Sequence, residues 1–463
     1  MEVNDTKDLV LIGTEKHVVM INCNLNNRDF SLPKNIVETN DSINQIKLMH
    51  KPNTTIEILI VVDNSGQIVV ITIDKIKNRE NKTKLEKYEV IKTHKYNSKI
   101  NYHDNSPWSV DCQYPYIIIG SNNRTVFVFN YEQEEKDIEN KIENSNTNLD
   151  AGEEISNSFI YKGNSNNIPY VTISDNGAFI GNNSIDRNFK IFNFYTGEMI
   201  CSCQNPNNEW GWGIKFIPKN LFRTINCKFN TYEDRKIFNI SNEALNRANM
   251  VDLNVSNPSQ YDEDKYNKIK FEDLNEQQKY IKLNLIDKYY ILSTCNHCAG
   301  LFKLDFQINQ NTNEKTVVPI PLGKIELTRI FIRDLFEDYQ QIDYGSFLMI
   351  KGIEQCSRYE FIFISENMNL FLLGSKAGDL HVFEMNLYHD KESKMIGVED
   401  EPNILIKFGE KVAGMKFIEN KNDKGKKVID IFVLTLSGMF YYYKILPYKK
   451  FWNHFEENDI IIK

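Results

Sequence analysis

The chain has 463 residues and a formal net charge of -8, from 55 basic and 63 acidic side chains. Hydrophobic residues make up 41% of it and charged residues 25%, which excludes a wholly disordered chain. The acidic balance argues against a general polyanion-binding protein. The length allows two or three ordinary domains or one large β domain. The aromatic content of 12% favours strands.

One pattern recurs along the whole chain: an apolar strand, a short turn of Gly, Ser, Asn or Asp, and a second apolar strand. Seven such hairpins follow one another, at 9–21, 58–71, 116–129, 178–192, 290–304, 370–383 and 431–443. Several hairpins are preceded by a further strand candidate, at 108–112, 170–173, 212–217 and 412–418. A unit of four strands in about 40–45 residues is typical of a WD-repeat blade.

Blades of this kind stack because none can bury both of its faces alone. The sequence therefore predicts an all-β fold, a single seven-bladed WD-repeat-like β-propeller over residues 1–446, with long loop insertions. We expect a strand near Leu9 to complete the last blade and so to tie the two termini together. Two packed sandwiches of fewer strands are the alternative.

Three insertions interrupt the predicted blades. Residues 75–95 are rich in Lys and Arg and predict a solvated basic linker. Residues 132–157 predict a disordered loop, because 132–154 carries nine acidic residues against two lysines and so holds -7 of the net charge. Residues 218–282 are expected to be partly helical, since 241–250 has a helix start signal and a helical composition. This longest insertion is either a partner-binding element or a variable loop without a role. The C-terminal tail, 447–463, either packs on a blade or is free.

Cys295-Asn-His-Cys298 has the only metal-like spacing in the sequence. Two cysteines at this spacing can supply half of a zinc site. No second pair follows at a suitable distance, and the motif falls on the turn of the fifth hairpin. We therefore interpret it as a plain turn and predict neither a metal site nor a cofactor. The eight cysteines are scattered, which fits reduced thiols in the cytosol or nucleus.

No motif of a known enzyme class stands out. The sequence contains no phosphate-binding Gly-rich loop, no His-Glu-x-x-His helix and no Gly-x-Ser-x-Gly elbow. We predict no catalytic residue and do not expect an enzyme. The alternative is a catalytic site of converging side chains at the mouth of a propeller, which the sequence does not locate.

Trp is scarce, with four in the chain, so Trp210-Gly-Trp212 attracts notice because this spacing puts both rings on one side of a strand. Packing between blades would explain such rings, and an aromatic hot spot for a partner protein is the functional interpretation. We predict partner binding at four residues: Trp108, Arg124, Trp210 and Trp212.

Four segments occur in an order that resembles a known family: Pro107-Trp-Ser-Val-Asp111, Ile119-Gly-Ser-Asn-Asn-Arg-Thr-Val-Phe-Val-Phe129, Asn167-Ile-Pro169 and Trp210-Gly-Trp212. They resemble the fungal WD-repeat-like regulators of ribonucleotide reductase gene transcription. The specific part covers about 106–218, and the usual Trp-Asp at strand ends is replaced by Phe-Asn at 129–130 and 192–193. The resemblance implies a nuclear or cytoplasmic regulator, with the role of a cullin ubiquitin-ligase adaptor in the DNA-damage response as one option.

Two functional hypotheses follow. The first is a non-enzymatic interaction scaffold in control of ribonucleotide reductase transcription or the DNA-damage response. The second is a propeller subunit of a cytoplasmic or membrane-trafficking assembly. Both predict protein partners, and neither predicts direct binding of nucleic acid or membrane. We expect no signal peptide and no transmembrane helix, since 429–446 reads as two strands, and we place the protein in the nucleus, the cytoplasm or both.

Overall fold

The structure is a computed structural model that describes residues 1–24, 29–76, 87–97, 106–144, 153–154, 158–227, 284–308, 315–327, 358–390, 395–398, 402–421, 425 and 427–446. The described residues fall into two compact units. Unit 1 comprises Met1–Ile173, Ser184–Asp186 and Val412–Lys463. Unit 2 comprises Ser174–Asn183 and Arg187–Lys411.

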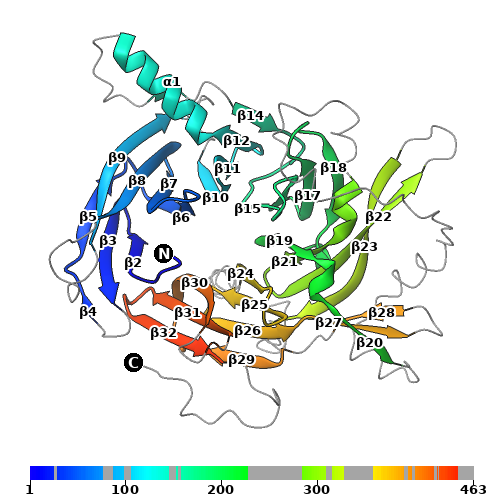
Figure 1. Ribbon diagram of the computed structural model, residues 1–463. Coiled ribbons are helices and arrows are strands. Elements are labelled where there is room, and N and C mark those ends of the chain that lie inside the picture. The colour runs from blue at the N-terminus through cyan, green and yellow to red at the C-terminus, as the bar shows by residue number, and fades with distance from the viewer. Residues whose placement is uncertain are drawn as a thin grey trace, which may run out of the picture. The chain divides into compact units, whose positions relative to one another are not determined.

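Unit 1 is built from antiparallel sheets whose strands follow one another in sequence (Figure 1). The first sheet holds β1 (Glu2–Val3), β2 (Leu9–Gly13), β3 (His17–Asn24), β4 (Asp29–Phe30) and β5 (Lys34–Glu38). The second holds β6 (Ile43–His50), β7 (Ile56–Asp63), β8 (Gln67–Ile76) and β9 (Lys87–Asn97), with β13 (Glu153–Glu154) parallel to β9. The third holds β10 (Pro107–Gln113), β11 (Tyr116–Ser121), β12 (Val126–Asn130) and β14 (Ser158–Tyr161). The last holds β30 (Val412–Lys421), β31 (Lys427–Thr435) and β32 (Phe440–Ile445).

Unit 2 continues the same plan. The fourth sheet contains β15 (Tyr170–Ile173), β16 (Phe179–Asn183), β17 (Asn188–Asn193) and β18 (Met199–Gln204), and the unit boundary follows β15. The fifth contains β19 (Gly213–Pro218), β21 (Tyr289–Thr294), β22 (Cys298–Ile308) and β23 (Lys315–Glu326). The sixth contains β24 (Tyr359–Ser365), β25 (Leu370–Ser375), β26 (Asp379–Glu384) and β29 (Ile404–Lys407). Short 3-10 turns lie at η1 (Pro206–Asn208), η2 (Lys219–Leu221) and η4 (Asn284–Lys288).

These sheets confirm the predicted fold class, an all-β chain with seven blades of a WD-repeat-like β-propeller. Each of the seven predicted hairpins is an antiparallel strand pair, namely β2–β3, β7–β8, β11–β12, β16–β17, β21–β22, β25–β26 and β31–β32. The four additional strand candidates correspond to β10, β15, β19 and β30.

Successive residues of a central strand alternate between two apolar clusters, which explains why these strands are apolar on both faces. In β7, Ile58, Ile60 and Val62 belong to one core cluster, which also holds Val110 and Phe129 of the next blade. The intervening Leu59 and Val61 of the same strand belong to a second cluster, shared with Leu9 and Leu11 of the first blade. Successive strand residues point to opposite faces, so each central blade is packed on both sides.

Charged pairs join the first strands of neighbouring blades in unit 1. Nζ of Lys47 in β6 lies 3.1 Å from Oδ1 of Asp111 in β10. The other carboxylate oxygen of Asp111 accepts hydrogen bonds from the Thr172 hydroxyl and the Ile173 backbone N–H, each at 3.1 Å. Asp111 is 6% exposed and Lys47 is partly exposed, so the buried carboxylate is held by two hydrogen bonds and by a cation that still reaches solvent.

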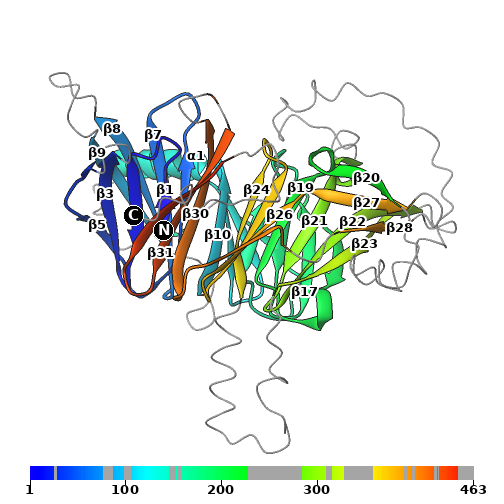
Figure 2. The same ribbon diagram turned by 90° about the horizontal axis from the view of Figure 1, so that it is seen from below.

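The N-terminal residues and the last blade are tied together within unit 1, but not in the predicted way. Leu9 does not complete that blade, because β2 pairs with β1 and β3, and the last sheet has three strands among the described residues. The connection is made instead by ion pairs, Lys416–Glu2 at 2.6 Å and Lys7–Asp430 at 2.7 Å. An apolar cluster that includes Val3 and Phe432 adds to it, and Figure 2 shows β30 and β31 beside β1.

The insertions differ from the sequence expectations. The acidic segment 132–157 is not simply a disordered loop, because it begins within helix α1 (Tyr131–Asn144). Glu, Gln and Lys are good helix formers, the Asn130 side chain accepts a hydrogen bond from the Gln133 backbone N–H, and Tyr131 is 2% exposed. The basic linker 75–95 overlaps β8 up to residue 76 and β9 from residue 87, and 77–86 lies outside the described residues.

The described part of the third insertion contains the short 3-10 turn η2 and one strand. Within 218–282 the structure describes 218–227, where β20 (Arg223–Cys227) runs parallel to β27 (Asn386–Asp390), which pairs with β28 (Met395–Gly397). Figure 2 shows these three strands side by side. The helix predicted at 241–250 and the tail 447–463 lie outside the described residues. None of the described helices is long and apolar enough to cross a membrane.

Candidate functional site

The two tryptophans of Trp210-Gly-Trp212 have different environments at the start of the fifth blade. Trp212 is 4% exposed, its backbone N–H donates to the Thr294 carbonyl at 2.8 Å, and its indole N–H donates to Oδ1 of Asn296. Trp210 is 38% exposed, and its ring meets that of Trp212 edge-on at 6.4 Å. Trp212 therefore forms a fixed base on which Trp210 presents an apolar surface to solvent.

A cation lies over the inner ring of this aromatic pair, that of Trp212. The guanidinium carbon of Arg358 lies 4.9 Å from the Trp212 ring centre, within the range of a cation–π interaction. Arg358 Nε lies 3.1 Å from Glu360, whose other carboxylate oxygen lies 3.0 Å from Lys376. We call Trp210, Trp212 and Arg358 the tryptophan cluster. It combines two residue types that dominate protein interfaces in a prearranged geometry.

A buried polar network holds the segment that carries this cluster. The Asn183 side-chain amide donates to the Gly213 carbonyl at 2.8 Å and to Oγ of Ser293 at 2.9 Å. Its Oδ1 accepts from the Asn205 amide at 2.9 Å, and the Ser293 hydroxyl donates to Oδ1 of Asn205 at 2.8 Å. Asn183 and Ser293 are fully buried, so these bonds fix residues 205–213 against the fifth blade.

Gly211 is required by the same network. A Cβ atom at this position would lie 1.7 Å from Oδ1 and 2.1 Å from Cγ of Asn183. No side chain fits unless Asn183 leaves its hydrogen bonds. The glycine between the two tryptophans is therefore explained by a close approach of the backbone to Asn183, not by turn geometry.

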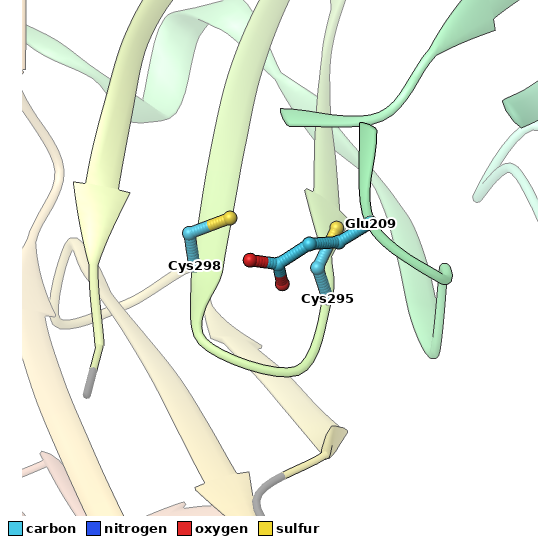
Figure 3. A group of neighbouring side chains, drawn as sticks. All are labelled: Glu209, Cys295 and Cys298. Carbon is cyan, nitrogen blue, oxygen red and sulfur yellow. The ribbon is translucent and has the colours of Figure 1, made fainter. Parts of the chain in front are cut away.

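The Cys295–Cys298 turn lies beside the tryptophan cluster. Its backbone closes with a hydrogen bond from the Cys295 N–H to the Cys298 carbonyl at 2.8 Å. Both thiols are free and fully buried, and the Glu209 carboxylate lies between the two sulfur atoms (Figure 3). Burial raises the pKa of the Cys295 thiol well above its ordinary value, and the hydrogen bond with Cys298 and the charge of Glu209 raise it further.

A second polar chain supports this turn from the sixth blade. The Leu327 N–H donates to the His297 carbonyl at 2.8 Å, and the Tyr359 hydroxyl donates to the Leu327 carbonyl at 3.2 Å. Nε2 of His381 lies 2.9 Å from the Tyr359 hydroxyl. Burial, followed by the charge of Lys407, lowers the pKa of His381 from 6.5 to about 4, so its ring is neutral at pH 7.

Trp108 and Arg124 belong to unit 1. Trp108 is half-buried near the start of β10, and Arg124 is exposed in the β11–β12 turn with a φ of 69°. All four predicted residues thus lie at the same edge of their own blades, where the first strand begins and the second turns into the third. The structure joins Trp210 and Trp212 in one cluster of unit 2, whereas Trp108 and Arg124 lie in unit 1.

The residues that arrange this site leave no recognisable pattern in the sequence. Arg358 and Glu209 carry no local motif, and they reach the site only because distant segments pair in one unit. Asn183 was hidden among many other asparagines, although the glycine in Trp210-Gly-Trp212 could have indicated a close neighbour. Among the described residues, Glu209, Cys295 and Cys298 form the one group of three potential metal-ligating side chains.

No family model matches the chain, and no curated protein matches its sequence. Among solved structures, it is similar to Saccharomyces cerevisiae Sqt1, with 10% identity, a TM-score of 0.44, and coverage of 94% of this chain and 79% of that one. It is also similar to a chain of the Mitotic Checkpoint Complex, with 8% identity, a TM-score of 0.46, and coverage of 95% and 84%.

The blades and the tryptophan cluster together define a class of protein: a WD-repeat-like β-propeller with a preformed aromatic and cationic surface on one blade edge.

Proposed function

We propose that the chain is a non-enzymatic interaction scaffold, and that a partner protein docks on the tryptophan cluster. The observation that carries this proposal is Trp210, a large aromatic ring that stays 38% exposed while its edge-on contact with the buried Trp212, itself covered by Arg358, supports it from below. A rigid aromatic ring loses little conformational entropy on binding, and Trp and Arg are the side chains most enriched at interface hot spots.

The biological setting comes from the sequence resemblance. By this resemblance, the scaffold acts in control of ribonucleotide reductase gene transcription or the DNA-damage response, in the nucleus or cytoplasm. The cullin ubiquitin-ligase adaptor role belongs to the same proposal. Three of the four segments that carry the resemblance, around Trp108, Arg124 and Trp210, also contain residues with a predicted role in partner binding. Trp108 and Arg124 are proposed as further contacts on their own blade.

Affinity purification of the full chain, followed by mass spectrometry, tests this function. We expect transcriptional or ubiquitin-ligase components to co-purify with the unchanged chain and to be depleted about tenfold or more with Trp210→Ala, the loss expected of one hot-spot side chain. Met199→Ala is a matched control, because Met199 is 45% exposed in the same unit but outside the cluster. Equal recovery with Trp210→Ala and the unchanged chain would contradict the docking site.

The same experiment separates the second hypothesis. A propeller subunit of a cytoplasmic or membrane-trafficking assembly would recover coat or vesicle proteins and no nuclear or ligase components. That result would leave an interaction scaffold in place and would refute the regulatory setting.

A further inference from the structure

The cluster of Glu209, Cys295 and Cys298 has no role in the proposed docking of a partner. Its ligand atoms, two Sγ and one carboxylate oxygen, all lie within 4.8 Å of one another. A tetrahedral zinc ion with Zn–S bonds of about 2.3 Å holds its ligands about 3.5–3.8 Å apart. Small side-chain rotations that move each ligand atom by about 1 Å would therefore bring the three atoms to bonding distance from a shared zinc ion.

We propose that these three side chains form a zinc site, with water in the fourth coordination position. Two thiolates and one carboxylate suit a borderline-soft divalent cation, whereas Mg2+ and Ca2+ prefer sites made of oxygen alone. Three protein ligands and one open position are a recognised zinc arrangement. Glu209 is half-buried, whereas the two thiols are fully buried.

The surrounding residues hold the three ligands in place. The Glu209 carboxylate accepts a hydrogen bond from the His297 backbone N–H at 3.2 Å, so the acid and the cysteine turn are joined directly. The Asn207 amide nitrogen lies 3.7 Å from Sγ of Cys298, and Asn207 Oδ1 accepts from Lys324 at 3.1 Å. An N–H directed at a thiolate sulfur is the kind of outer contact that stabilises metal-bound cysteine.

Close packing presses the loop onto the hairpin. A Cβ atom at position 300 would lie 2.5 Å from the ring of Pro206, so Gly300 lets the 205–209 loop approach β22. The Asn183 network fixes Asn205, the neighbour of Pro206 in the same loop. The three ligands thus come from two segments that are held independently of any ion, as a preformed site requires.

Zinc binds cysteine as the thiolate, so binding at this site releases the thiol protons to solvent, and we expect the affinity for the metal to rise with pH.

The test is a titration of the full chain with Co2+, after purification under reducing conditions and removal of metal with a chelator. We expect one equivalent to bind with thiolate-to-cobalt charge-transfer absorption and the visible bands of tetrahedral cobalt, and Zn2+ to displace it. Cys295→Ser and Cys298→Ser should each weaken the charge-transfer absorption, and the double variant should abolish it. Glu209→Gln should keep thiolate absorption and weaken affinity about 10–100-fold.

Two variants serve as matched controls. Cys203→Ser removes another thiol of unit 2, and Glu198→Gln neutralises an exposed carboxylate of the same unit; both should bind cobalt as the unchanged chain does. The proposal is overturned if the reduced chain binds no cobalt, if thiolate absorption survives loss of both Cys295 and Cys298, or if these cysteines form a disulfide that reductant does not open. If a cysteine variant fails to fold, the titration of the unchanged chain decides. This inference is independent of the docking role, because metal binding needs no partner protein.

Discussion

The contact between Gly211 and Asn183 makes a prediction that can be worked out from the structure. In Gly211→Ala the new Cβ would lie 1.7 Å from Oδ1 of Asn183, so the asparagine must leave its place. That displacement breaks its bonds to the Gly213 carbonyl, to Ser293 and to Asn205, all among buried groups. At about 1–3 kcal/mol for each unsatisfied buried group, we expect a loss of about 3–5 kcal/mol in unfolding free energy.

Asn183→Ala removes the same hydrogen bonds directly and should cost about the same, 3–5 kcal/mol. It also clears the space into which a Cβ at position 211 would point. The double variant should therefore cost about 4 kcal/mol instead of the sum of about 8, an interaction energy of about 3 kcal/mol or more.

Urea unfolding of the full chain, followed by circular dichroism and tryptophan fluorescence, measures these free energies. Asn182→Ala is the control: Asn182 is equally buried, but its side chain has no hydrogen-bond partner among the described residues. Its replacement should cost less than about 1 kcal/mol. Additive losses from Gly211→Ala and Asn183→Ala, or a large loss from Asn182→Ala, would refute the reasoning.

Three further predictions concern stability. Burial lowers the pKa of His381 from 6.5 to about 4, so the unfolded chain binds a proton at this residue at a higher pH than the folded chain does. The free energy of unfolding should therefore fall by about 3 kcal/mol as pH drops from 6.5 to below 4. His381→Gln should remove this part of the pH dependence of urea unfolding. Asp111→Ala should cost about 1–3 kcal/mol in thermal unfolding, because it removes the acceptor of the Thr172 and Ile173 hydrogen bonds and the partner of the partly exposed Lys47; an unchanged stability would contradict this role. In urea unfolding, Trp212→Ala should lower the free energy of unfolding by about 3–5 kcal/mol, because Trp212 is buried, and Trp210→Ala should lower it by less than about 1 kcal/mol. Equal losses of free energy from the two variants would contradict the different burial of the two rings.

The blades could be predicted because their signal is local. A hairpin needs two apolar strands and a turn, and each of the seven hairpins carries both within about 20 residues. The acidic segment was misjudged for a physical reason. Its charge suggested disorder, yet its Glu, Gln and Lys residues also favour a helix, and burial of Tyr131 anchors the first turn of α1.

The site could be predicted only in fragments. Trp210, Trp212 and the Cys295–Cys298 turn were each singled out, but nothing in their spacing shows that they are neighbours. They meet because β19 pairs with β21, which places position 213 opposite Thr294. Arg358 enters from the next blade, more than 140 residues beyond Trp212, and contacts at such a separation leave no local pattern.

The central claim is that a partner protein docks on the tryptophan cluster. Photo-crosslinking in cells tests it most directly, with a photoreactive phenylalanine analogue placed at position 210 or, as a control, at position 199. The docking site predicts a discrete crosslinked partner from position 210 and none from 199. The same crosslinks from both positions, or none from 210 while a partner still co-purifies with the chain, would contradict it.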